Sequence, residues 1–235
     1  MPVAVQCRLK LVVDSLPIPD LSRELALYAS GHVHVAGLDE AGRGAWAGPV
    51  CAAAVVLPLE REDLAGFLAG VRDSKTLTAA RREELLPIIR DVAVAVGVGW
   101  GKPAEIDMWG IVPTTRLAME RAVQQLGDRV NALVVDHLDL PGLNLPQRSL
   151  PKADALCLSV AAASVVAKVE RDRLMVGLED QYPGYGLAQH KGYGTRQHRE
   201  ALRRLGCSPI HRVSWRPMRL VSEEGVERKG DQAKG

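Results

Sequence analysis

The stretch that decides the fold runs from Val35 to Val50 and reads VAGLDEAGRGAWAGPV. Its apolar beginning leads into two adjacent carboxylates, Asp39 and Glu40, after which the chain turns through two glycines. This pattern predicts a buried strand that delivers acidic side chains to a loop whose backbone a ligand approaches closely. We therefore interpret the stretch as a functional site rather than as part of the scaffold.

The glycine spacing Gly42-x-Gly44-x-x-Ala47 also fits the fingerprint of a dinucleotide-binding turn. That fingerprint needs a helix after the glycines, but Pro49 has no N–H to donate and disfavours a helical conformation at the residue before it. Residues 50–57 are mostly alanine and β-branched residues, which predict a second strand instead. No helix N-terminus is left to hold a pyrophosphate, so we reject this interpretation.

Length and composition are those of one large globular domain. The chain has 235 residues, of which 47% are apolar, and this is enough to bury a full core. The four cysteines lie far apart without C-x-x-C spacing and favour a reducing compartment. No N-terminal stretch has the pattern of a signal peptide, and the longest apolar run, 155–167, is too short to span a bilayer. We expect a soluble, cytoplasmic protein with no membrane association.

Charge is distributed unevenly along the chain. The net charge is +2, but residues 186–221 hold eight Lys or Arg and one acid, a net +7 that leaves −5 for the rest. A basic segment beside an acidic body suits a protein that grips a polyanion next to a cation-binding pocket. The competing interpretation is a solvated basic helix face, because charge runs usually mark surface.

Local patterns predict an α/β fold. Strands are expected at 33–38, 50–57, 92–98 and 132–135, the first three as an antiparallel meander and the fourth as a buried, parallel strand. Helices are expected between Asp20 and Gly31, at 78–90, at 103–109, from Thr114 or Thr115 to Gly127, at 156–181 and at 196–205. Residues 189–194 are expected to form a loop.

Acidic residues lie at the ends of these elements. Asp39 and Glu40 follow the first strand, Asp136 follows the fourth, and Asp154 precedes the long helix. Each one alone is more often a cap or a solvated loop residue, since Asp favours those places. Together they would repel one another unless a cation neutralised them. Oxygen ligands without His or Cys select Mg²⁺ or Mn²⁺, and two such ions suit in-line attack on a phosphodiester.

These residues stand in motifs that resemble the ribonuclease HII family, the type 2 ribonucleases H. The motifs are GLDEAGRG at 37–44 with AGPV at 47–50, DSK at 73–75, Val-Val-Asp136, KAD at 152–154, AAASVVAKVERD at 161–172 and QHKGY at 189–193. The resemblance covers about 33–219. It implies a ribonuclease H-like α/β fold, in which helices flank a five-stranded mixed sheet and a helical C-terminal part closes over a nucleic-acid hybrid.

The resemblance also implies an activity. Family members of this kind are endonucleases that hydrolyse the RNA strand of RNA/DNA hybrids and nick DNA on the 5′ side of an embedded ribonucleotide, which leaves 3′-hydroxyl and 5′-phosphate ends. By the same resemblance, Asp39, Glu40, Asp136 and Asp154 hold two Mg²⁺ or Mn²⁺ ions. The implied partner is nucleic acid, and the protein is expected to act as a monomer.

Substrate contacts follow from the resemblance as well. The main chain of Gly42-Arg43-Gly44 is expected to read the ribose 2′-hydroxyl, and Tyr193 to stack on the next sugar, although a surface loop aromatic is the simpler interpretation of Tyr193. The expected phosphate contacts or supporting residues are Ser74, Lys75, Lys168 and Lys191. Lys168 and Asp172 lie one helical turn apart, so a plain ion pair fits equally well.

His190 and His211 could shuttle protons, but a lone His in a basic loop is more often a phosphate contact or a bystander, so neither is assigned a role. The chain departs from the family pattern at Gly194, where proline is usual, and at His137, where a small residue is common. Gly42-Arg43-Gly44, together with the expected absence of a sizeable N-terminal domain, argues against the related ribonuclease HIII.

We expect an N-terminal arm and short helix at 1–31, a catalytic domain at 32–221 with a basic helical part at about 182–221, and a disordered tail at 222–235. Two other functions remain open. A DNA nuclease or resolvase of the same fold would need the acids but not the ribose-reading loop. A hybrid-binding module without catalysis is disfavoured because all four acids are present.

Overall fold

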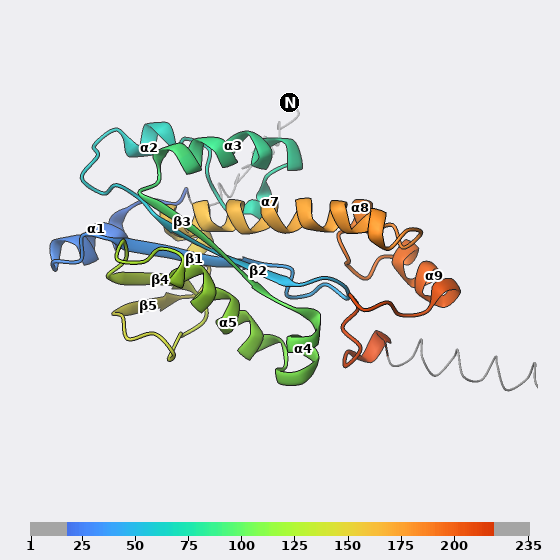
Figure 1. Cartoon of the computed structure of the whole chain (residues 1–235). Helices are drawn as coiled ribbons and strands as arrows, with labels where there is room; N and C mark the ends of the chain where they lie inside the picture. The colour runs from blue at the N-terminus through green and yellow to red at the C-terminus, as the bar shows by residue number, and fades with distance from the viewer. Residues whose placement is uncertain (1–17, 219–235) are drawn as a thin grey trace, which may run out of the picture.

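A five-stranded mixed sheet forms the centre of the computed structural model, which describes residues 18–218 (Figure 1). The strands are β1 (Val35–Ala41), β2 (Val50–Val56), β3 (Ala95–Gly101), β4 (Ala132–Asp136) and β5 (Gln147–Leu150). Their order is β3-β2-β1-β4-β5; β1 pairs antiparallel with β2 and parallel with β4. The predicted five-stranded mixed sheet is confirmed.

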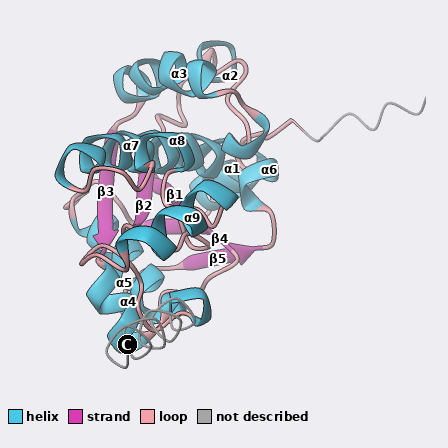
Figure 2. Cartoon of the chain, turned by 90° about the vertical axis from the view of Figure 1, so that its right-hand side faces the viewer, coloured by secondary structure: helices cyan, strands magenta, loops and turns pink. Residues whose placement is uncertain are grey.

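Helices cover both faces of this sheet, as Figure 2 shows edge-on. They are α1 (Ser22–Ala29), α2 (Leu64–Phe67), α3 (Ala79–Val92), α4 (Pro103–Trp109), α5 (Ile111–Gln124), α6 (Ala153–Leu156), α7 (Leu158–Gln181), α8 (Leu187–His190) and α9 (Arg196–Leu205), with a 3₁₀ turn η1 (Ser74–Thr76). Helix α7 packs on β1 and β2, and α3 lies outside it; α5 packs on β2 and β3 from the other face. Because helices enclose it on both faces, β2 is buried along its whole length.

Small residues bring α7 against the sheet. The run 161–163 is alanine and fully buried, and a Cβ at Gly37 of β1 would lie 2.3 Å from the carbonyl carbon of Ser159. The start of α7 is held by α1, because Ser159 donates from its N–H (2.9 Å) and its hydroxyl (2.7 Å) to Glu24 Oε1. Burial raises the pKa of the Glu24 carboxyl against these lowering hydrogen bonds. The first strand and the long helix are thereby fixed relative to one another.

Glycines on one face of β3 do the same for α5. Gly97, Gly99 and Gly101 alternate with larger residues, so all three point to the same side. A Cβ at Gly97 or Gly99 would lie 2.0 or 1.9 Å from a backbone carbonyl oxygen of α5. This spacing lets the helix backbone rest directly on the strand.

Several predicted boundaries are wrong. The first strand continues through both acids to Ala41, and the third lies at 95–101 rather than 92–98, because α3 continues past Pro87 to Val92 and pairing starts only when Val94 donates to Val56. The helix expected at Thr114 or Thr115 begins at Ile111, after Gly110 has turned the chain with a φ of +85°.

Other differences lie around the long helix. It begins at Leu158 instead of 156, because Cys157 is extended and separates it from α6. The residues expected to form a loop at 189–194 start inside the short helix α8. The position of β5 was not predicted by any local pattern.

The ends of the chain, 1–17 and 219–235, lie outside the described residues, so the disordered tail at 222–235 and most of the N-terminal arm stay predictions, as does the division into domains. Between residues 18 and 218, no helix combines the length and apolar character that crossing a membrane requires.

We predict that Gly99→Ala lowers the free energy of unfolding by about 1–3 kcal/mol, because its Cβ would meet the Ala118 carbonyl oxygen at 1.9 Å and force α5 away. The matched control is Gly177→Ala in α7, where a Cβ meets nothing within 4 Å and removal of a helical glycine stabilises by about 0.5–1 kcal/mol. Urea denaturation of both variants checks the prediction, and equal stability of the two would contradict it.

Candidate active site

A cleft of about 700 Å³ opens where β1 and β4 end. The two strands run parallel in a register that ends with Leu38 opposite Val135, so the next residues, Asp39 and Asp136, emerge side by side. The cleft is lined by Glu40, Arg43, Asp73, Lys75, Asp136, His137, Pro151, Lys152, Asp154 and Ala155. The ends of parallel strands are a usual place for ligand sites in α/β sheets.

Asp39 and Glu40 belong to β1 itself and pair with β2, whereas the sequence pattern placed them after the strand. Pairing with β4 has stopped by this point, and the Glu40 N–H donates to Asp39 Oδ1 at 2.7 Å. On the side of β4, the Asp39 carboxylate thus takes the place of a strand carbonyl as the acceptor for the Glu40 N–H. This opening of the sheet allows neighbouring strand residues to act in one electrostatic cluster.

The four acids come together from three segments of the chain. Asp39 is buried beneath the cleft, and Asp154, at the start of α6, is buried in its wall. Asp136 is oriented by the Ala153 N–H, which donates to its Oδ1 at 2.8 Å. Glu40, Asp136 and Asp154 thus line one cleft, and Asp39, which is not among its lining residues, lies near enough to feel the charges of Glu40 and Asp136. The role of the four acids as metal ligands in catalysis stays a prediction.

Burial and mutual repulsion raise the pKa values of Asp39, Glu40 and Asp136. Burial is the larger cause for Asp39, followed by the charges of Glu40 and Asp136. Burial also raises the pKa of Glu40, against the lowering effect of Arg43, whose Nη1 lies 3.0 Å from Glu40 Oε1. Burial and the charge of Asp154 raise the pKa of Asp136. The positive charge near these three carboxylates therefore does not offset their burial and their mutual repulsion.

Lys75 is the nearest basic group to the other acids. Its Nζ lies 3.2 Å from Asp154 Oδ2 and 3.8 Å from Asp73 Oδ1. Partial burial alone would lower the pKa of Lys75, but attraction to Asp39, Asp73 and Asp154 outweighs burial and raises it. Lys75 therefore stays charged and partly neutralises the cluster.

The donor set fits a hard divalent cation. The four carboxylates offer only oxygens, and Glu40 Oε2 is buried without a hydrogen-bond partner. As the side chains stand, no three His, Cys, Asp or Glu residues within 18–218 form a group ready to hold a metal ion. Lys75 and Arg43 pair with Asp154 and Glu40, so carboxylates that share a cation would first have to turn from these partners.

The loop at 42–44 borders the acids. Gly42 has a φ of +92°, and a Cβ there would lie 1.8 Å from Arg171 Nε, so glycine is required for folding. Gly44 is exposed, and a Cβ there would meet nothing within 4 Å. Nothing within the described residues 18–218 therefore explains the missing side chain at Gly44.

A second cleft, of about 690 Å³, lies between α3, α7 and α8. It contains Lys168, Lys191 and Tyr193, which the structure thus separates from the carboxylate cleft. Lys168 forms the alternative ion pair, with Asp172 Oδ1 at 2.7 Å, and its Nζ lies 5.6 Å from the centre of the Tyr193 ring. These residues would meet a ligand that extends beyond the acids.

Ser74 lines neither cleft. It is buried, and its hydroxyl accepts a hydrogen bond of 2.7 Å from Ser164 of α7. Asp73, beside it, does line the carboxylate cleft, and its side chain accepts from the Lys75 N–H at 2.9 Å. The structure therefore places Asp73 and Lys75 at the site and gives Ser74 a contact with the scaffold.

Backbone strain marks both clefts. Within residues 18–218, three non-glycine residues have positive φ, namely His137 at 61°, Lys152 at 59° and Lys191 at 52°. All three line one of the two clefts. Such conformations persist where the surrounding structure imposes them and cluster at functional sites. The departure from the family pattern at His137 was the only one of these signals visible in the sequence.

Sequence reasoning missed a chain of imidazoles behind Tyr193. The Ser208 N–H donates to His211 Nδ1 at 3.0 Å, so His211 Nε2 carries the proton and donates to His198 Nε2 at 3.1 Å. His198 Nδ1 then donates to the Tyr193 carbonyl at 3.0 Å. His190 stacks on His198 with ring centres 4.4 Å apart. The buried and neutral His198, held by His211, thus fixes the main chain of the Tyr193 loop.

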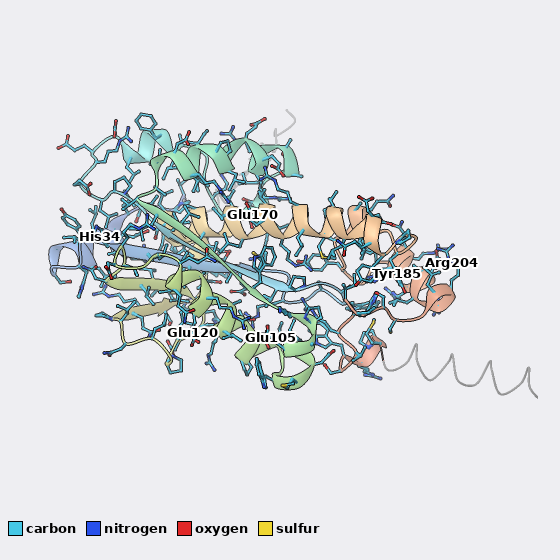
Figure 3. All side chains as sticks on the ribbon, viewed as in Figure 1. His34, Glu105, Glu120, Glu170, Tyr185 and Arg204 are labelled. Carbon is cyan, nitrogen blue, oxygen red and sulfur yellow. The ribbon has the colours of Figure 1, made fainter. Side chains whose placement is uncertain are left out.

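The C-terminal part that carries these histidines packs at the end of α7 remote from His34, as the labels Tyr185 and Arg204 show in Figure 3. It is tied together by the Tyr185 hydroxyl, which donates to the Gly206 carbonyl at 2.9 Å. At Gly194 a Cβ would lie 2.2 Å from the Trp46 ring, so the absence of a side chain lets the indole pack against this loop.

Comparison with known proteins shows the family of the chain. The sequence pattern of the family described as Ribonuclease HII matches residues 36–218. The chain is similar to the Ribonuclease HII of Chloroflexus aurantiacus, with 51% identity over 201 residues that cover 86% of this chain and 95% of that relative.

Solved structures are similar as well. The ribonuclease H2 from Pyrococcus horikoshii OT3 has a TM-score of 0.68 at 31% identity, covering 81% of this chain and 98% of that one. A structure of Bst-RNase HIII in complex with Mn²⁺ has a TM-score of 0.66 at 21% identity and covers 85% of this chain and 72% of that one. At this identity the similarity supports the fold alone. The predicted ribonuclease H-like fold is confirmed.

We predict that the imidazole chain makes the protein less stable in mild acid. Burial lowers the pKa values of His198 and His211 from 6.5 to about 4. Below pH 6.5 the unfolded chain binds protons that the folded protein does not, so stability falls as the pH drops towards 4. From pH 7 to pH 5 the loss should be on the order of 2 kcal/mol for each imidazole.

Urea denaturation at both pH values measures this loss. A double variant, His198→Gln with His211→Gln, should lose clearly less stability than the parent between pH 7 and pH 5. If the double variant lost as much free energy of unfolding from pH 7 to pH 5 as the parent, these imidazoles would not be the cause of the loss.

Proposed function

Because the chain belongs to the ribonuclease HII family, a family of nucleases, we propose that it hydrolyses the RNA strand of RNA/DNA hybrids and nicks duplex DNA on the 5′ side of an embedded ribonucleotide. The products carry 3′-hydroxyl and 5′-phosphate ends. The observation that carries this proposal is the convergence of Asp39, Glu40, Asp136 and Asp154 beside a loop whose Gly44 is open to an approaching ligand.

The proposal includes two divalent cations, Mg²⁺ or Mn²⁺, held by the four carboxylates. It is supported by the oxygen-only donor set, by the unpartnered Glu40 Oε2 and by the raised pKa values of three of the acids. The Bst-RNase HIII neighbour was solved with Mn²⁺. When bound, such ions supply an activated water and stabilise the leaving oxygen of a phosphodiester.

The side chains of this protein orient the substrate. One carboxylate oxygen of Asp136 accepts a hydrogen bond from the Ala153 N–H. The position of its other oxygen is then set by the end of β4. Lys75 remains charged in the cleft, where it would attract the phosphate next to the acids. Ser74 anchors the loop that carries Lys75 by its hydrogen bond with Ser164 of α7, and we do not propose that it contacts the substrate.

The main chain of Gly42-Arg43-Gly44 is proposed to read the 2′-hydroxyl, and Tyr193 to stack on the neighbouring sugar. Lys168 and Lys191 lie in the cleft with Tyr193 and would hold the duplex further from the acids. We further propose that the protein acts as a monomer in the cytoplasm, where buried thiols such as Cys51 and Cys157 stay reduced.

One assay separates this function from the two others. A labelled DNA duplex with a single ribonucleotide should be cut on the 5′ side of that ribonucleotide when Mg²⁺ or Mn²⁺ is present. Cutting of four-way DNA junctions without cutting of this duplex would indicate a resolvase. Retarded migration of an RNA/DNA hybrid without any cutting would indicate a binding module.

We predict that Asp136→Asn retains fold and substrate binding but cuts by orders of magnitude more slowly, since an amide is a poor replacement for a metal-binding carboxylate. The asparagine oxygen still accepts from the Ala153 N–H, so stability should be kept. Initial rates and melting temperatures check this, with Asp63→Asn outside both clefts as the control. Rates like those of the parent would remove Asp136 from the mechanism.

Two glycine variants test the ribose-reading loop. Gly44→Ala should leave the melting temperature unchanged, because its Cβ has free space, yet lower kcat/KM on the single-ribonucleotide duplex about tenfold or more by crowding the sugar. Gly42→Ala should instead destabilise the protein, because its Cβ would overlap Arg171. Full activity of Gly44→Ala would contradict close approach of the ribose at this position.

A further inference from the structure

Arg212 is a buried cation that binds only main-chain oxygens. Its side chain is fully buried and makes no ion pair with a carboxylate in residues 18–218. Its Nη1 donates to the Arg43 carbonyl and its Nη2 to the Gly42 carbonyl, both at 2.7 Å. Its Nε and Nη2 also reach the Gly48 carbonyl at 3.1 and 3.0 Å. A buried guanidinium is costly, so this arrangement calls for a function.

The position of Arg212 sets the direction of two peptide groups. In a trans peptide the C=O of one residue points opposite to the N–H of the next, and the residues described contain no cis peptide bond. With the carbonyls of Gly42 and Arg43 turned inward to Arg212, the N–H groups of Arg43 and Gly44 point outward. Neither N–H has a hydrogen-bond acceptor within residues 18–218.

Arg212 is itself held firmly in place. Its own N–H donates to the Trp46 carbonyl at 3.0 Å, and His211 forms a β-bridge with Ala47. The Trp215 ring lies 5.0 Å from the guanidinium carbon, a distance that suits a cation–π contact. The C-terminal part of the chain therefore reaches back and grips the loop that follows β1.

We propose that Arg212 is the positioning residue that gives this protein its selectivity for ribose over deoxyribose. It holds two peptide groups of the 42–44 loop in the orientation that presents their N–H groups to a sugar hydroxyl. This inference rests on the proposed ribose-reading function of the loop and adds the residue that enforces it. Arg212 itself touches neither the substrate nor the reacting atoms.

The planar guanidinium is needed because several carbonyls in different directions must be bound at once. A lysine at this position keeps the positive charge but offers one compact ammonium group, which does not reproduce the fork. Arg212→Lys is thus expected to leave at least one of the two peptide groups free to rotate. Trp215→Leu keeps the guanidinium and removes only the ring beside it.

The test measures binding of two duplexes of identical sequence, one with a single ribonucleotide and one all-DNA, by fluorescence anisotropy. Proteins carry Asp136→Asn so that bound substrate is not cut. The readout is the Kd for the all-DNA duplex divided by the Kd for the ribonucleotide duplex. A loss of stability alone does not change this ratio when binding is measured well below the melting temperature. Arg121→Met, which loses hydrogen bonds with Glu105 and the Trp100 carbonyl and none with the 42–44 loop, is the control for destabilisation.

Arg212→Lys should lower the Kd ratio about tenfold, the value of one to two misplaced hydrogen bonds, mostly by weakening binding to the ribonucleotide duplex. Trp215→Leu, the second variant should Arg212→Lys not fold, should lower the ratio less. Arg121→Met should keep the parental ratio. In otherwise wild-type protein, Arg212→Lys should reduce kcat/KM on the ribonucleotide duplex to the same extent.

Two kinds of failure are distinguishable. A parent protein that shows no preference for the ribonucleotide duplex overturns the ribose-reading function, and with it this inference. A parent that shows the preference, together with Arg212→Lys and Trp215→Leu variants that retain it in full, overturns the role of Arg212 and leaves the proposed function intact.

Discussion

Repulsion between buried carboxylates is the constraint on which the rest of the site depends. Parallel pairing of β1 with β4 places Asp39 beside Asp136, and α6 adds Asp154 to the same cluster. Like charges of this kind, removed from water, raise one another's pKa values and oppose folding. The chain tolerates them because the closely packed elements around them, α7 on Gly37 and α5 on the β3 glycines, leave the strand ends little freedom.

Positive charge is supplied to this region in two different ways. Lys75 and Arg43 pair directly with acids in the cleft and are free to turn from them towards a ligand. Arg171 and Arg212 are fully buried and bind only carbonyl oxygens around the loop after β1. The first pair balances the charge of the acids, whereas the second pair fixes the shape of the loop beside them.

The sequence predicted the parts of the site that arise from short-range pattern. Alternation and apolar runs predicted four strands, and the acids at the ends of the predicted elements, which would repel one another without a cation, predicted a shared site for Asp39 and Asp136. β5 was not predicted because its largely half-exposed residues do not form an apolar run. The start of β3 was predicted too early because α3 continues past Pro87 to Val92.

Long-range contacts were beyond such reasoning. Arg212 stands in the basic segment 186–221 and was counted towards a surface that grips a polyanion, yet it is buried and bonded to carbonyls about 170 positions earlier in the chain. His198 was given no role for the same reason, because its neighbours are set by the tertiary fold. Local pattern therefore found the acids that are proposed to perform chemistry and missed the residues that hold the neighbouring loops.

The most direct test of the account is a crystal structure of the protein with Mn²⁺ and a duplex carrying one ribonucleotide, in which anomalous scattering locates the metal. The account predicts Mn²⁺ bound by oxygens of Asp39, Glu40, Asp136 and Asp154, with the 2′-hydroxyl of the ribonucleotide against the main chain of 42–44. A bound duplex with Mn²⁺ elsewhere and these carboxylates still paired with Lys75 and Arg43 would contradict it.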